Sequence, residues 1–185
     1  MSANRFFNLF TGVVVVVAVL SLTAMQGILV KAEIEKPASV TPAYEGLVGK
    51  SLLDRDVAQF VAVNSCAAAY EYRLCEAMGI ALEMDGDQMV QAVVLFPGHT
   101  NGFAAFHGDL PHGLHWNDSL VSVQEKLGVA PDAVFLNEAG LPNESGTPDS
   151  IRLWAVYNDL GLTIVYNTQS ADHDNATIHA ILVTK

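Results

Sequence analysis

The stretch MGIALEMDGDQMVQAVVLF at residues 78–96 carries the pattern that decides the fold. Residues 79–84 and 89–96 are two short apolar runs, each long enough for one strand. The pair Asp85-Gly86 lies between them, and Asp-Gly between apolar runs is a strong signal for a β-hairpin. This stretch therefore predicts two antiparallel strands joined by a tight turn.

The residues before this hairpin extend the pattern to a helix and a further strand. Residues 51–63 place apolar side chains at helical spacing, with Asp54 as a candidate N-cap. Residues 70–74 alternate as a strand does. Residues 46–96 are therefore predicted to form a helix followed by three antiparallel strands.

A second copy of this pattern begins at residue 113. Asp118 or Ser119 can cap a helix that ends at Gly128, and residues 129–150 then form a long loop rich in proline and glycine. Three strands are predicted after it, at residues 151–157, 161–166 and 178–183.

The two copies predict one α+β domain over residues 46–185. Residues 78–82 and 160–164 resemble each other, which supports a tandem of units at 46–96 and 113–185. Each unit supplies a helix and antiparallel strands, so we expect one sheet with both helices on the same face.

The N-terminal residues 1–32 form a separate apolar segment. Residues 12–30 are uncharged, and the segment contains Arg5 and Lys31 but no acidic residue. A transmembrane anchor is favoured, and a signal peptide cleaved after Ala32 is the alternative. Either one places the domain outside the cytoplasm, behind a polar linker at residues 33–45.

Charge and motifs exclude several classes of function. The formal net charge is −11, so nucleic acid is not an expected partner, because phosphate binding needs clustered lysine and arginine. The chain has no nucleophile elbow, no zinc-protease motif and no glycine-rich phosphate loop. We therefore predict that it is not an enzyme and needs no cofactor.

Cys66 and Cys75 are the only two cysteines. In an oxidising compartment they can form a disulfide, and two buried free thiols are the other possibility. A zinc site is disfavoured by their spacing.

The region 99–118 is rich in polar residues and holds three histidines. His107, His112 and His115 are donors of the type that zinc or copper takes. Their spacing matches no strong metal signature, so a surface loop is favoured. A periplasmic metal- or small-ligand-binding protein that uses this loop is the alternative function.

Apolar side chains in the predicted loops are the candidates for binding a partner. Aromatic residues dominate binding hot spots, and long loops in compact domains are often binding segments. The candidate contact residues are Phe103, Phe106, Trp116, Leu136 and Leu141.

Residues 113–166 contain a capped helix, a glycine stop, a proline turn and an aromatic strand, at Ser119, Val123, Leu127, Gly128, Pro131, Trp154, Tyr157 and Gly161. In these features the region resembles the SmpA/OmlA family of small envelope proteins, which is similar in fold to the β-lactamase inhibitory protein. The chain lacks the cysteine that the family lipidates. The resemblance implies a tandem fold and a place in the cell envelope.

These observations together predict a membrane-tethered, extracytoplasmic protein-binding module. An envelope assembly factor, an accessory subunit of a membrane complex and an inhibitor or immunity protein all fit. The acidic balance favours a partner protein with a basic surface.

Overall fold

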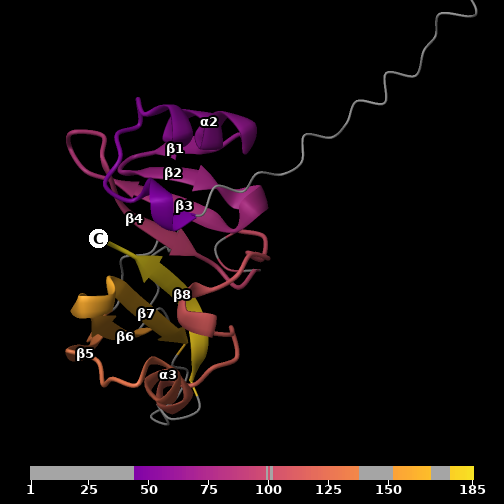
Figure 1. Cartoon of the computed structure of the whole chain (residues 1–185). Helices are drawn as coiled ribbons and strands as arrows, with labels where there is room; N and C mark the ends of the chain where they lie inside the picture. Colours follow the sequence, from indigo (N-terminus) through magenta and orange to yellow (C-terminus); the bar gives the residue numbers. More distant parts are fainter. Residues whose placement is uncertain (1–43, 99, 101, 138–151, 168–175) are drawn as a thin grey trace, which may run out of the picture. The chain divides into compact units, whose positions relative to one another are not determined.

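The computed structural model describes residues 44–98, 100, 102–137, 152–167 and 176–185 (Figure 1). They belong to one compact unit, Thr41–Lys185. The anchor or signal predicted at residues 1–32 lies outside the described residues. Among the described residues, no helix has the length and apolar character needed to cross a membrane.

Eight strands form one antiparallel sheet in the order β1-β2-β3-β4-β8-β7-β6-β5. The sheet and two α-helices confirm the predicted α+β class. The first half holds α2 (Arg55–Val63), β1 (Ala67–Ala69), β2 (Tyr72–Cys75), β3 (Ile80–Met84) and β4 (Val90–Leu95). The second half holds α3 (Leu120–Leu127), β5 (Ala133–Asn137), β6 (Arg152–Tyr157), β7 (Leu162–Asn167) and β8 (Thr177–Val183).

The two halves repeat the same order of elements and meet at the centre of the sheet. β4 pairs with β8, and β1–β3 and β7–β5 extend outward on either side (Figure 1). Short 3-10 helices, η2 (Glu76–Met78) and η4 (Asn158–Leu160), precede β3 and β7. Each ends at a left-handed glycine, Gly79 or Gly161. The order of strands therefore has an approximate two-fold symmetry about β4 and β8.

Each half contains one strand that the sequence did not predict. β1 consists of three alanines, and alanine has little preference for strands. β5 lies inside the predicted loop of residues 129–150, whose proline and glycine content conceals it. Each unit therefore has four strands rather than the predicted three, and the two additional strands are the edges of the sheet.

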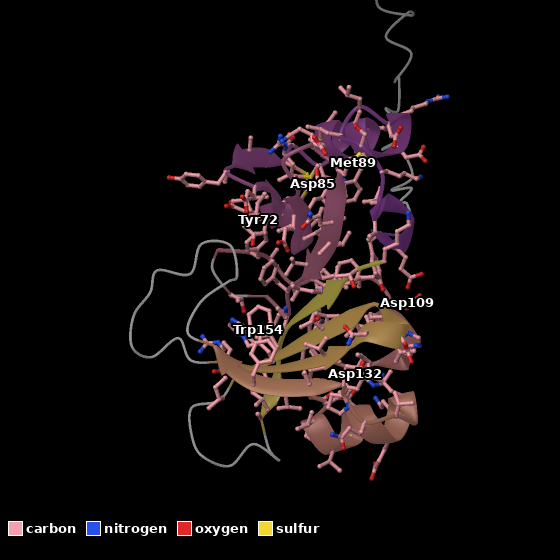
Figure 2. The ribbon with its side chains drawn as sticks, turned by 90° about the vertical axis from the view of Figure 1, so that its left-hand side faces the viewer. Tyr72, Asp85, Met89, Asp109, Asp132 and Trp154 are labelled. Atoms are coloured by element: carbon pink, nitrogen blue, oxygen red, sulfur yellow. A yellow bond between two sulfur atoms is a disulfide. The ribbon has the colours of Figure 1, made fainter. Side chains whose placement is uncertain are left out.

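Both helices pack on the same face of the sheet. Val57 and Phe60 of α2 and Val123 of α3 belong to one cluster of buried residues, together with Leu82 of β3 and Ile164 of β7. A second cluster covers the opposite face and includes Trp154. Figure 2 shows Trp154 and Tyr72 on the side of the sheet away from α3.

The predicted caps place both helix starts correctly. Ser119 is the N-cap of α3, and the backbone N–H of Ser122 donates to its Oγ over 3.3 Å. Asp54 is at the N-cap position of α2, but its carboxylate accepts a hydrogen bond from the backbone N–H of Ser51 instead. A 3-10 helix, η1 (Tyr44–Leu47), begins where the linker was predicted to end, and the ring of Tyr44 is buried.

Cys66 and Cys75 form a disulfide. It joins the residue that precedes β1 to the last residue of β2, and the side chain of Cys75 is fully buried. In the second half, Asp132 precedes β5 and its Oδ2 accepts a hydrogen bond of 2.7 Å from the backbone N–H of Asn158. Each edge strand is thus fixed to its neighbouring strand at the open end of the hairpin, away from the residues that connect the two strands.

Removing the disulfide is expected to lower the free energy of unfolding by about 2–3 kcal/mol, because a short closed loop restricts the unfolded chain. The variant is the double substitution Cys66→Ala/Cys75→Ala, measured by urea denaturation. The wild-type protein should lose the same stability when a reductant is added, and the variant should not respond to it. A wild-type stability that is independent of reductant would contradict the pairing.

Candidate interaction surface

β5 is the last strand of the sheet in the second half. Its register with β6 runs from Ala133 opposite Val156 to Asn137 opposite Arg152. Among the described residues, no strand pairs with its other edge. Alternate backbone N–H and C=O groups along that edge are therefore placed to receive another strand.

Three consecutive large apolar side chains of β5 are exposed. Val134 is 47% exposed, Phe135 43% and Leu136 56%. Charged residues and proline are the usual protection of an edge strand, and residues 133–137 contain neither. The opposite edge strand, β1, exposes only alanine methyl groups. β5 is thus the more apolar of the two edges.

The side chains of β5 point to both faces of the sheet. Phe135 lies opposite Trp154 of β6, and their rings stack with centroids 6.2 Å apart and planes 7° from parallel. Val134 and Leu136 lie opposite Ala155 and Leu153, which belong to the cluster under the helices. A strand added to β5 would therefore meet an aromatic ring on one face and two aliphatic side chains on the other.

Hydrogen bonds from the backbone fix the start of β5. The N–H of Asp132 donates to the carbonyl oxygen of Val156 over 2.8 Å. The carboxylate of the same residue accepts from Asn158, at the start of η4. Figure 2 shows Asp132 on the side of α3, where β5 begins. The edge is therefore positioned before any partner binds.

Two of the predicted contact residues are buried, so their prediction as surface residues is wrong. Phe103 is 2% exposed because its ring stacks on Phe96, with centroids 4.2 Å apart. Phe106 is 4% exposed because it packs edge-to-face against Tyr44 at 5.5 Å. Both are core residues of the connection between the two halves.

The other three predicted contact residues have different environments. Leu136 lies on the exposed edge strand. Trp116 is half-buried and lines two hollows, one of about 360 Å³ and one of about 420 Å³. Leu141 lies outside the described residues. Only Leu136 belongs to the surface formed by Val134, Phe135 and Leu136, hereafter the β5 edge.

The histidines of the loop do not gather into a metal site. His107 and His115 line the larger hollow with Asp109, whereas His112 is not among its lining residues. The described residues include all three histidines, and within them no three His, Cys, Asp or Glu side chains are placed to hold a metal ion. His115 Nδ1 instead lies 2.7 Å from Lys126 Nζ. The metal hypothesis therefore finds no support in this loop.

Asp118 is the only charged side chain that is buried among the described residues, with 8% exposed. Lys126 Nζ donates to both of its carboxylate oxygens, over 2.9 and 2.7 Å. The backbone N–H of His115 donates over 2.7 Å and the hydroxyl of Ser122 over 3.2 Å. Burial raises the pKa of Asp118, but these hydrogen bonds and the nearby ammonium group outweigh it and hold the pKa below its usual value.

These contacts give Asp118 a structural role. They tie the connection between the halves to the first and last turns of α3, because Ser122 and Lys126 lie on the helix. Each carboxylate oxygen already accepts two hydrogen bonds, so the group is fully occupied as an acceptor. The sequence marked Asp118 as a candidate helix cap, but it did not predict the pairing with Lys126, which lies eight residues along the chain.

The chain matches no protein-family model, and it matches neither a curated protein nor a solved structure. The resemblance to the SmpA/OmlA family therefore stays a prediction.

Proposed function

We propose that this protein is a protein-binding module whose contact surface is the β5 edge. The observation that carries the proposal is an uncharged edge strand on which Val134, Phe135 and Leu136 are all exposed. Monomeric soluble proteins protect such edges, because exposed apolar strands pair with other chains. A binding role explains why residues 133–137 contain neither charge nor proline.

The proposal includes a place outside the cytoplasm and a tether to the membrane. The disulfide between Cys66 and Cys75 supports an oxidising compartment, where such bonds form and persist. The apolar residues 12–30 support a membrane segment or a signal for export. The module would then present the β5 edge to proteins of the cell envelope.

The expected partner is a protein with a basic surface. The described residues carry thirteen acidic and six basic side chains. Two of the six, Lys50 and Lys126, are already paired with Asp56 and Asp118. The excess of negative charge would attract a basic partner and accelerate its association.

Lysine substitutions on the β5 edge are expected to abolish binding of the partner. The tagged full-length chain and its V134K/L136K variant are purified from the native host in a mild detergent, and the proteins that stay bound are quantified by mass spectrometry. Both side chains are about half exposed, so the substitutions place charge on the edge with little loss of packing.

The matched control is L53K, because Leu53 is 90% exposed and lies in the first half of the chain, just before α2 and outside the β5 edge. A partner that the wild-type and L53K chains retain and the V134K/L136K chain loses supports the proposal. Equal recovery of the same partner by all three chains would refute the β5 edge as its binding site.

A further inference from the structure

Among the described residues, the ring of Phe135 stacks on one other ring only, and part of it is exposed. Its stack with Trp154 is nearly parallel, so one ring face is turned toward β6. The other face is turned toward the free edge of the sheet, and 43% of the residue is exposed. In a sheet, the next side chain on this face would come from a strand added to β5, at the position beside Phe135.

Aromatic faces and negative charge select the same kind of side chain. The face of an aromatic ring attracts cations, and arginine stacks on it with its planar guanidinium group. The molecule as a whole is acidic, with an excess of seven negative charges over the described residues, although the one charged side chain of β5, β6 and β7 is that of Arg152. An arginine or lysine beside Phe135 would therefore continue the stack outward from Trp154.

On the opposite face of the sheet, the side chains of β5 favour apolar neighbours. Val134 and Leu136 flank Phe135 and point to the opposite face, where both are about half exposed. An added strand places the residues on either side of its basic residue next to these two side chains. Burying them there removes apolar surface from water.

A second copy of this chain is a poor occupant of the edge. Each copy carries a net charge of −11, so two copies repel each other. Its own β5 would bring a phenylalanine rather than a cation to the ring of Phe135. A positively charged segment of another protein can place a cation on the ring of Phe135. The net negative charge of the molecule also attracts such a segment.

We infer that β5 receives an extended segment of a basic partner protein as an additional strand of the sheet. An arginine or lysine of that segment lies over the outward face of Phe135, and apolar residues of the segment lie beside Val134 and Leu136. This inference rests on the proposed function and specifies the mode of binding and the chemistry of the partner.

The test uses two fluorescently labelled peptides, Thr-Thr-Val-Arg-Val-Thr-Thr and the same peptide with glutamate in place of arginine. Their binding to the full-length chain in mild detergent is measured by anisotropy. The arginine peptide should bind about tenfold more tightly than the glutamate peptide. That difference should shrink as NaCl is raised from about 0.05 to about 0.5 M, because salt screens the charges.

Two variants distinguish the contribution of the Phe135 ring to peptide binding from that of the rest of the β5 edge. F135L keeps an apolar side chain but removes the aromatic face, and it should weaken binding of the arginine peptide about fivefold. V134K/L136K should bind neither peptide, whereas L53K should bind as the wild type does. Circular dichroism of each variant checks that its fold is retained.

Equal affinity for the two peptides, no binding of either, or an unchanged affinity in F135L would overturn the inference. So would concentration-dependent self-association that V134K/L136K abolishes, because the edge would then belong to a second copy. If the peptides fail to bind while a cellular partner still requires Val134 and Leu136, strand addition by a basic segment is wrong and the proposed function stands.

Discussion

Replacing Gly79 with alanine is expected to lower the free energy of unfolding by about 4 kcal/mol. Gly79 ends η2 with φ at +68°, a conformation that costs a residue with a side chain. A Cβ atom there would also lie 2.5 Å from the carbonyl oxygen of Ala104 and from the backbone nitrogen of Phe106. Backbone atoms cannot rotate away, so the connection between the halves must move.

The matched control is Gly128→Ala, which separates the clash from the backbone strain. Gly128 has φ at +70°, but no atom from another part of the chain lies within 4 Å of the position that a Cβ would take there. Its substitution should therefore cost only about 1–2 kcal/mol. Urea denaturation of the two variants measures the difference, and equal losses of stability would contradict the close packing of residues 104–106 on Gly79.

Replacing Asp118 with asparagine is expected to lower the free energy of unfolding at pH 7 by about 3 kcal/mol. The variant keeps the shape of the side chain but removes the charge that accepts hydrogen bonds from Lys126, His115 and Ser122. The side chain of Lys126 is 30% exposed, so water compensates for part of the loss. Chemical denaturation at pH 7 gives the value.

The same variant should change how stability depends on pH. The pKa of Asp118 in the folded protein lies below its usual value of 3.8. The stabilisation from this carboxylate is therefore complete above the pKa of the unfolded chain and is lost as the pH falls through the folded-state pKa. D118N should lose less stability than the wild type between about pH 5 and pH 2.

Asp56→Asn is the control for this experiment. Asp56 also pairs with a lysine, Lys50, over 2.7 Å, but both side chains are exposed to solvent. Its pKa is lowered by the hydrogen bond from Lys50, yet surface pairs contribute little because water and salt screen them. An effect of D56N as large as that of D118N would show that burial is not the source of the stabilisation.

The elements that the sequence predicted well have local signals. Ser119 and Gly128 mark the two ends of α3, and Asp85-Gly86 lies in the turn between β3 and β4. Capping and turn geometry depend on residues within a few positions of one another. The order of helix and strands in each half could therefore be predicted from one chain.

The candidate site was harder to predict because it depends on contacts between distant residues. β5 lies in a segment with loop composition. Its partner strand β6 follows only after residues 138–151 of the sequence. Phe103 and Phe106 have no periodic apolar neighbours, so their burial against Phe96 and Tyr44 is visible only in three dimensions. Leu136 was predicted as a contact residue of a loop, and the structure places it on an edge strand.

The most direct test of the account is a photo-crosslink from the β5 edge in living cells. A photoreactive amino acid replaces Leu136 in the tagged full-length chain, and a second chain carries it in place of Leu53 as the control, since both positions are exposed and apolar. We expect one discrete crosslinked protein from position 136 and none from position 53. Crosslinking at position 53 alone, or at neither position, would contradict the claim that this protein binds its partner through β5.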